Sequence, residues 1–454
     1  MYRIALLIII LLSGLVTTIR ADDDLRSKIG QMIMVGFYGT DIPDSLRYDI
    51  QHRNLGGVVT LAYNLEDPTQ IRQLTDSLQS LAQTPLFLAV DQEGGYVARL
   101  DEQNGFEETY TAYELGTVYN FQDSTREQAA RMAAWLRNTG LNVNLAPVVD
   151  VNVNPQSPAI GNHERSFSDN PFAVTNHASW FIDEFHQKNI ITTLKHFPGH
   201  GSAEDDSHNG FTDITDTWSD QELIPYENLL ATGYADIIMT GHLFNADIDE
   251  AYPATLSNNA INGLLRDSLG HDGVVISDAM YMRAIQDNYD FDEAIELAVN
   301  AGVDILLYTA HMRAERSLTG MIIDIVENKV HQGLIAESTI DAAYQRIADL
   351  KDRYLTGQPI AARRDILPQN YTLSAYPNPF NSRTQIQFQL ARSGYAELKL
   401  YNVRGQYVQT INEGRLNRGK HQISFDGSHL ASGVYFVRLQ TDQQTVTYKL
   451  TLMK

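Results

Sequence analysis

The chain alternates short apolar stretches with longer segments whose apolar residues recur at helical spacing. From Gln31 onward the apolar stretches return about every thirty residues, the length of one strand–helix unit. They cover Met32–Phe37, Gly57–Ala62, Leu86–Val90, Val143–Val149, Ile190–Leu194, Ile237–Thr240, Val274–Ile276 and Ile305–Tyr308. Helical patterns lie between them, as in Pro68–Leu81, Ser124–Asn138 and Phe291–Ala301. We therefore predict an α/β fold, a closed (β/α)₈ barrel. An open doubly wound sheet is the alternative, but eight parallel strands in this length favour closure.

The pattern changes after Lys351. Residues 356–370 contain one glycine, two prolines and a pair of arginines, a composition that predicts a linker. Beyond it, Thr384–Leu390 alternates strictly, with apolar residues on one face and glutamines on the other, and several later stretches repeat this period. Strict period two with glycine turns predicts a small all-β, Ig-like sandwich over residues 371–454. No cluster of ionisable residues occurs in it, so we expect no second catalytic domain there.

The N-terminus has the pattern of a secretory signal. Arg3 precedes an apolar run over residues 5–12, and Ala21 then leads into three aspartates. The apolar run is short for a membrane span, so an uncleaved anchor is the less favoured alternative. We predict a signal peptide over residues 1–21, an exported protein, and a catalytic domain over residues 22–355.

The composition excludes some classes of function. The net charge of -22 and the pI near 4.9 argue against a nucleic-acid partner, which requires a basic surface. The chain contains no cysteine, which excludes disulfides and thiolate chemistry.

Polar residues follow the predicted strands in a regular phase. They come directly after the third to the seventh apolar stretch, and are Asp91-Gln92-Glu93, Asp150, Lys195-His196, Gly241-His242 and Asp278. The carboxyl ends of barrel strands meet at one face, where barrel enzymes assemble their active sites. The sequence therefore predicts an active-site rim.

The richest part of this rim is the stretch KHFPGHGSAEDDSH, residues 195–208. Asp206 stands two residues before His208, close enough for its carboxylate to orient the imidazole. A metal site built from His196, His200 and His208 is the alternative, but the usual helical or hairpin spacing of such ligands is absent. We expect catalysis without a metal or an organic cofactor.

Five motifs in order resemble glycoside hydrolase family 3, and within it the single-barrel β-N-acetylglucosaminidases. They are DQEGG from Asp91, NLAPVVDV from Asn144, KHFPGHG with DSH from Lys195, PATLS from Pro253 and ISDAM from Ile276. The resemblance implies that Asp278 is the nucleophile that forms a glycosyl-enzyme, and that His208 is the general acid/base, oriented by Asp206. It also implies a −1 sugar pocket formed by Asp91, Arg99, Arg165, Lys195 and His196. The substrate would be a carbohydrate with a terminal β-linked N-acetylglucosamine.

The chain departs from the family pattern at three places. Tyr96 stands where an arginine is common, the Gly161–Phe167 segment is about two residues longer than usual, and no proline follows His208 nearby. A β-glucosidase or a glycoside phosphorylase on the same barrel therefore remains an alternative, because a neutral histidine base does not repel phosphate. A surface sugar-binding protein that has lost catalysis is the alternative from another class.

The C-terminal segment resembles the sorting domains of the type IX secretion system. The resemblance rests on YPNPFN at Tyr376, GVY at Gly433 and the alternating terminus Val446–Lys454. It implies secretion machinery as a partner and a location outside the cell or on its surface, with no membrane span in the mature protein. An ordinary carbohydrate-binding or Ig-like module is the alternative, although a binding face should display several exposed aromatic residues.

Overall fold

The computed structural model describes residues 24–207, 209–356, 372–390, 394–402, 406–416, 419–441 and 445–454. The predicted signal peptide, nearly all of the predicted linker, His208 and Tyr371 lie outside these residues. The chain forms two compact units, divided between residues 356 and 372, and each is described by itself.

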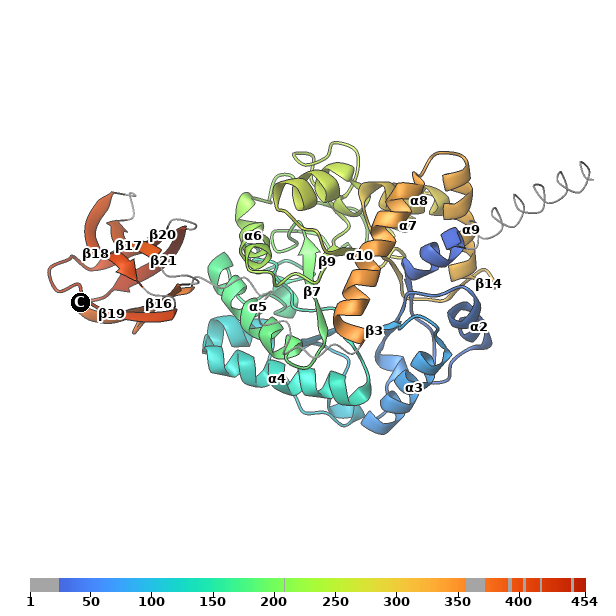
Figure 1. The fold of residues 1–454 in the computed structure, drawn as a ribbon, viewed down its shortest axis with the longest axis horizontal. Helices are drawn as coiled ribbons and strands as arrows, with labels where there is room; N and C mark the ends of the chain where they lie inside the picture. Colours follow the sequence, from blue (N-terminus) through green and yellow to red (C-terminus); the bar gives the residue numbers. More distant parts are fainter. Residues whose placement is uncertain are drawn as a thin grey trace, which may run out of the picture. The chain divides into compact units, whose positions relative to one another are not determined.

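The first unit is a parallel barrel surrounded by helices (Figure 1). Its strands are β1 (Ile33–Val35), β2 (Gly57–Thr60), β3 (Phe87–Val90), β6 (Val143–Asn144), β7 (Ile191–Phe197), β9 (Ile237–Thr240), β11 (Val274–Ser277) and β12 (Leu306–Tyr308). They pair in the order β11-β9-β7-β6-β3-β2-β1-β12, and a bridge between Ile276 and Ile305 joins the two ends. The predicted (β/α)₈ barrel is confirmed.

Most strands are a little shorter than predicted, and the two differences that matter most for the candidate site are at β6 and β7. The strand predicted over residues 143–149 is regular only at Val143–Asn144, because Pro147 has no N–H for the ladder. Val148 pairs again with Lys195 through an isolated bridge. Strand β7 continues through Lys195 to Phe197, so Lys195 and His196, which we expected after this strand, are among its last residues.

Two helices begin at a side-chain cap that is followed by a proline. Asp67 accepts hydrogen bonds from the amides of Thr69 and Gln70, and Asn170 accepts one from Phe172, each cap being followed by a proline at the first helical position. The helices are α2 (Asp44–His52), α3 (Pro68–Leu81), α4 (Gln122–Thr139), α5 (Pro171–His186), α6 (Ile224–Ala231), α7 (Arg283–Gln286), α8 (Phe291–Ala301), α9 (Leu318–His331) and α10 (Glu337–Leu355). Their apolar faces pack against the strands to form one continuous core.

Short elements decorate the carboxyl end of the barrel. They are β4 (Gln92–Gly94) with β5 (Val97–Ala98), β8 (Thr212–Asp213) with β10 (Leu243–Phe244), β13 (Met312–Arg313) with β14 (Arg316–Ser317), and the helical segment η5 (Asp220–Glu222), whereas the helical segment η7 (Asn259–Ser268) lies between β9 and β11 in the chain. The first pair forms a hairpin directly after β3, and the second ties the segment after β7 to the segment after β9.

The second unit is an all-β sandwich. One sheet orders its strands β15-β16-β19 and the other β18-β17-β20-β21, with antiparallel pairing throughout. The strands are β15 (Thr372–Tyr376), β16 (Arg383–Leu390), β17 (Gly394–Asn402), β18 (Tyr407–Leu416), β19 (Gly419–Asp426), β20 (Gly433–Thr441) and β21 (Thr445–Leu452). Ile386 and Phe388 are buried together with Leu398 and Leu400, as the period-two pattern predicts. The predicted sandwich is confirmed.

Candidate active site

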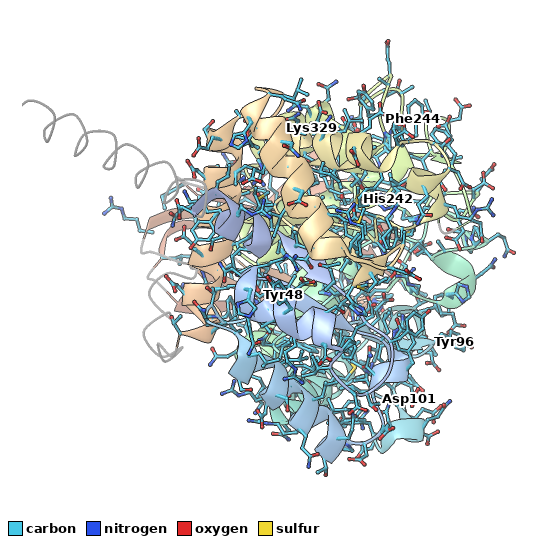
Figure 2. All side chains as sticks on the ribbon, turned by 90° about the vertical axis from the view of Figure 1, so that its right-hand side faces the viewer. Tyr48, Tyr96, Asp101, His242, Phe244 and Lys329 are labelled. Carbon is cyan, nitrogen blue, oxygen red and sulfur yellow. The ribbon has the colours of Figure 1, made fainter. Side chains whose placement is uncertain are left out.

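The polar residues after the barrel strands share one rim. Asp91 follows β3, Lys195 and His196 end β7, and Asp278 follows β11. In Figure 2, Tyr96 and Asp101 after β3 and Phe244 after β9 lie on the right-hand side, whereas Tyr48 on α2 lies away from it. This distribution is the one expected for the carboxyl face of a barrel.

Glu93 lies at the centre of the buried ion network. Its two oxygens accept hydrogen bonds from Arg165 Nε at 2.9 Å and Nη2 at 2.8 Å, and Lys195 Nζ lies 2.7 Å from Oε1. Lys195 Nζ also donates to Asp91 Oδ1 at 2.9 Å, and Arg99 Nη2 lies 3.7 Å from Asp91 Oδ2. The network thus draws the predicted sugar-binding residues Asp91, Arg99, Arg165 and Lys195 together.

The ion network keeps its charges despite burial. Burial alone would raise the pKa of Glu93, but Arg165 and Lys195 hold this pKa well below its usual range. Burial alone would lower the pKa of Lys195, yet Asp91 and Glu93 raise it. Asp91 keeps about a fifth of its side chain exposed. A neutral, hydroxyl-rich ligand could therefore meet fixed carboxylate and ammonium groups at one side of this network.

His196 is oriented by Asp150, which is fully buried after β6. His196 Nδ1 lies 2.8 Å from Asp150 Oδ2, and the His196 amide donates to Oδ1 at 3.0 Å. His196 Nε2 lies 3.3 Å from Arg165 Nη2, which can only donate. This pattern assigns the proton to Nδ1, donated to Asp150, and leaves Nε2 as the acceptor.

Asp278 is half-buried at the end of β11, and its segment contacts the loop that carries Asp206. The Asp278 amide donates to Thr240 O at 3.0 Å, which fixes the residue against β9. The Ala284 amide lies 3.4 Å from Ser207 O, so the segment after Asp278 meets the residue that follows Asp206. The structure thus brings two of the three predicted catalytic residues to neighbouring segments, while the third, His208, lies outside the described residues.

The metal alternative involves His196 and His200, together with His208. His200 Nε2 lies 3.3 Å from the Ser207 hydroxyl, and His196 is committed to Asp150. Within the described parts of the chain, no group of three or more His, Asp or Glu side chains is arranged to hold a metal ion.

Four residues of the site were not among the predicted site residues. Glu93 and Asp150 were noted only as part of the rim, although they organise Arg165 and His196. His242 is buried, and its Nδ1 lies 2.9 Å from the Thr255 hydroxyl. Its Nε2 donates to Ala279 O at 3.1 Å, so His242 supports the residue next to Asp278. Glu222, which supports the loop after β7, carries no motif that could have revealed it.

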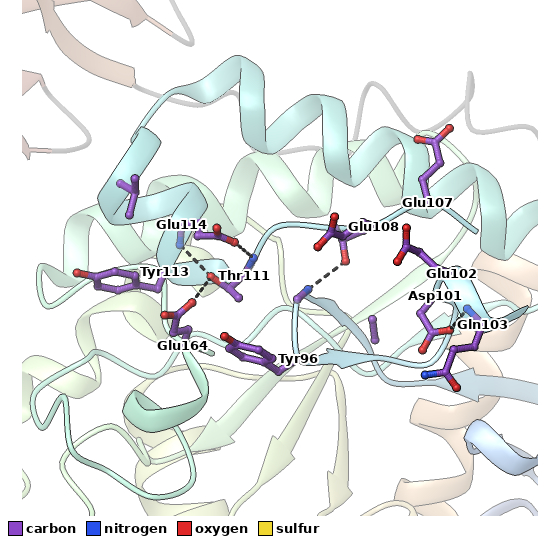
Figure 3. A pocket seen from close by; sticks show the side chains of 14 residues that line it. Tyr96, Asp101, Glu102, Gln103, Glu107, Glu108, Thr111, Tyr113, Glu114 and Glu164 are labelled. Carbon is purple, nitrogen blue, oxygen red and sulfur yellow. Dashed lines mark hydrogen bonds between the residues drawn. The ribbon is translucent and has the colours of Figure 1, made fainter. Parts of the chain in front are cut away.

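A pocket of about 560 Å³ opens beside the hairpin formed by β4 and β5 (Figure 3). Tyr96, 69% exposed, lies at this pocket, at the position where the resemblance leads us to expect an arginine. Glu164, the residue before Arg165, lines the same pocket and accepts a hydrogen bond from the Thr111 hydroxyl at 2.9 Å. Tyr96 and Glu164, which belong to the two segments where we expect a departure from the family pattern, therefore line one pocket.

Comparison with known proteins assigns the barrel. Residues 24–350 match the Glycosyl hydrolase family 3 N terminal domain. The chain belongs to glycoside hydrolase family 3. Residues 374–453 match the Secretion system C-terminal sorting domain, as the sequence of the tail predicted.

Several relatives are named for the activity expected from the motifs. The chain is 34% identical to Beta-hexosaminidase A of Pseudoalteromonas piscicida, over 69% of this chain and 56% of that protein. It is 33% identical to a Beta-hexosaminidase of Tolumonas auensis, over 61% of this chain and 81% of that protein. A solved family 3 β-N-acetylglucosaminidase from Paenibacillus sp. str. FPU-7 superposes with a TM-score of 0.69 and 34% identity, over 74% of this chain and 64% of that one. The chain thus spans less than two thirds of the Pseudoalteromonas and Paenibacillus proteins.

The search for membrane spans covered the described residues. None of their helices combines the length and the apolar character needed to cross a bilayer.

Proposed function

We propose that this chain is an exported, retaining exo-β-N-acetylglucosaminidase. The observation that carries the proposal is the half-buried Asp278 at the end of β11, next to the loop of Asp206 and on the rim that holds the Glu93 ion network. The names of the Pseudoalteromonas and Paenibacillus relatives support the same activity.

In the first step, the Asp278 carboxylate attacks the anomeric carbon and forms a glycosyl ester. The glycosidic C–O bond breaks, and the His208 imidazolium gives its proton to the departing oxygen. Asp206, two residues away, favours the imidazolium by its negative charge. A histidine suits this donor role because its unperturbed pKa of about 6.5 lies near neutrality.

In the second step, neutral His208 takes a proton from water, and the water oxygen attacks the anomeric carbon. The ester bond to Asp278 breaks and the carboxylate is restored. Two inversions at the same carbon give overall retention of configuration.

The ion network would bind the terminal sugar. Asp91, Lys195 and His196 would hold its hydroxyl groups, with Arg99 and Arg165 fixing the carboxylates around them. Because Arg165 is committed to Glu93 through two hydrogen bonds, we assign it mainly to positioning Glu93 and Lys195.

The test is hydrolysis of aryl N-acetyl-β-glucosaminide compared with aryl β-glucoside, each with and without inorganic phosphate. We expect the N-acetyl substrate to have the higher kcat/KM and phosphate to have no effect. A higher kcat/KM for the glucoside, or release of a sugar 1-phosphate, would favour the β-glucosidase or the phosphorylase. Saturable sugar binding by folded protein without any hydrolysis would favour the sugar-binding alternative.

The C-terminal sandwich would direct the chain to the secretion machinery. The match to a sorting domain supports export to the cell surface or the medium. Deletion of residues 371–454 should retain an active enzyme in the periplasm, because the barrel has its own continuous core. Normal arrival of the truncated protein outside the cell would contradict this role.

A further inference from the structure

Residues 197–203, here called the stem, connect β7 to the loop that carries the predicted acid/base pair. On one side, the stem is anchored to the segment after β6. The His200 amide donates to Asp150 Oδ1 at 2.8 Å, and the Asn154 amide donates to Gly201 O at 2.9 Å. The same carboxylate that orients His196 thus also fixes the stem.

On the other side, three residues spaced four apart contact the stem from a later part of the chain. Trp218 Nε1 donates to Pro198 O at 3.1 Å. The ring of Tyr226 packs edge-on against Phe197, with ring centroids 5.3 Å apart. Glu222, at the end of η5, lies between these two contacts in the sequence and reaches the middle of the stem.

Glu222 makes the closest of these contacts. Its Oε2 accepts a hydrogen bond from the Gly201 amide at 2.9 Å, and its side chain is 0% exposed. A Cβ at Gly199, where φ is +128°, would lie 2.6 Å from Glu222 Cβ. A Cβ at Gly201 would lie 1.7 Å from Val151 O on the opposite side. The stem is therefore clamped between Glu222 and the segment after β6 with no space for a side chain.

The surroundings of Glu222 favour a neutral acid. The Tyr226 hydroxyl is buried without a hydrogen-bond partner among the described residues. Burial raises the pKa of Glu222 to about 8, and the negative charge of Asp150 acts in the same direction, whereas hydrogen bonds from Ser202 and from the Gly201 amide act against this shift. His200, which also lies beside Asp150, has its pKa lowered to about 4 by burial, so it brings no positive charge at neutral pH.

We propose that Glu222 is a positioning residue: it holds the stem in place and so sets the position of the loop that carries Asp206 relative to Asp278. It does so in the protonated form, because an ionised Glu222 would be a second buried anion next to Asp150. Above pH 8 the clamp should loosen and turnover should fall. The inference rests on the proposed glycosidase function and adds a residue that does not touch the substrate.

The first experiment compares Glu222→Ala, Glu222→Gln and the surface control Glu227→Gln in the full chain. For Glu222→Ala we expect a ~10-fold or larger fall in kcat with a smaller change in KM, because the chemistry depends on alignment more than sugar binding does. Hydrogen exchange of peptides spanning residues 197–207 should rise in this variant. Glu222→Gln keeps the shape and the acceptor for Gly201, so its kcat at pH 7 should stay within about threefold of wild type.

The second experiment is the pH profile of kcat, a readout that a merely structural role would not move. Glutamine cannot ionise, so Glu222→Gln should retain at pH 9 a larger fraction of its pH 7 activity than wild type or Glu227→Gln. If the profile of Glu222→Gln superimposes on that of wild type, the inference is overturned, even when Glu222→Ala fails to fold. Loss of activity in Asp278→Ala alongside that result would leave the proposed function standing, whereas full activity of Asp278→Ala would reject the function itself.

Discussion

Each end of the barrel buries a lysine, and the pKa values of the two lysines shift in opposite directions. Lys195 ends β7 at the carboxyl face, where Asp91 and Glu93 raise its pKa against the effect of burial. Lys351 on α10 reaches the amino face and donates to Gln31 Oε1 at 2.7 Å and Gly56 O at 2.9 Å, both uncharged. Burial lowers the pKa of Lys351 to about 7. At the carboxyl face, counter-ions keep the buried Lys195 charged. At the amino face, Lys351 is a neutral hydrogen-bond donor above pH 7.

The carboxylates of the two ends differ in their exposure to solvent. At the amino face, Asp304 precedes β12, accepts from the Val275 amide at 2.7 Å, and is bound by both Arg266 and Arg346. Asp236 precedes β9 and is paired with His186 at 2.7 Å. These groups join neighbouring strands and are fully buried, which indicates a role in stability. Asp91 and Asp278 at the other end keep partial exposure, as groups that meet a ligand must.

The largest expected effect is the loss of activity on substituting Asp278, compared with a residue at the other end of β11. Asp278→Ala after β11 should lower kcat by about 10⁴-fold or more on aryl N-acetylglucosaminide, because no nucleophile remains. Its melting temperature should stay within a few degrees of wild type. Asp272→Ala, an exposed residue just before the same strand, is the matched control and should retain full activity. Substantial turnover by Asp278→Ala would contradict a catalytic role for the carboxyl end of this strand.

The converse effect is expected at the amino face. Asp304→Ala leaves Arg266 and Arg346 without their shared carboxylate, which should lower the free energy of unfolding by ~3–5 kcal/mol. For a barrel of this size, the melting temperature should fall by roughly 4–7 °C. At temperatures where the variant is folded, kcat/KM should match wild type. The control is Asp267→Ala, an exposed acid next to Arg266; equal melting temperatures in the two variants would contradict the stabilising role.

Glu93 should contribute to both activity and stability. It lies at the carboxyl face, yet it is buried and both of its oxygens are bound by Arg165 and Lys195. Glu93→Gln keeps the volume but leaves Lys195 and Arg165 with one counter-ion fewer. We expect a loss of ~2–3 kcal/mol in the free energy of unfolding and a ~100-fold lower kcat/KM. Thermal melts and steady-state kinetics on the same preparation test this. A variant that loses activity without losing stability would show that Glu93 serves activity alone, like the other residues of the carboxyl face.

The smallest effect concerns the pH dependence contributed by Lys351. Its pKa is about 7 in the folded chain and about 10.4 in the unfolded chain. Between these values the unfolded state binds more protons, so this lysine makes stability rise with pH, by at most about 1.4 kcal/mol per unit. Lys351→Met lacks this contribution. The melting temperature of wild type relative to Lys351→Met should therefore increase from pH 7 to pH 9, and a constant difference would show that burial does not shift this lysine.

Much of the fold could be predicted from periodicity. The spacing of apolar runs predicted the barrel strands in order, and the helical pattern over Pro68–Leu81 coincides with α3, which Asp67 caps in the structure. The sandwich followed from strict alternation, as the burial of Phe388 confirms. The domain boundaries and the individual catalytic roles remain predictions. They depend on residues outside the described parts of the chain, His208 above all, and on chemistry that geometry alone does not report.

The sequence by itself determined which residues face the carboxyl rim, because strand direction and side-chain phase are local properties. Only the tertiary structure decided how they pair. Arg165 reaches Glu93 across 72 positions, and Lys195 reaches Asp91 across 104. Glu222 shows the same limit, since no local pattern links it to Gly201. The folded chain brings Glu222 to the Gly201 amide and buries its carboxyl group, and this burial raises its pKa.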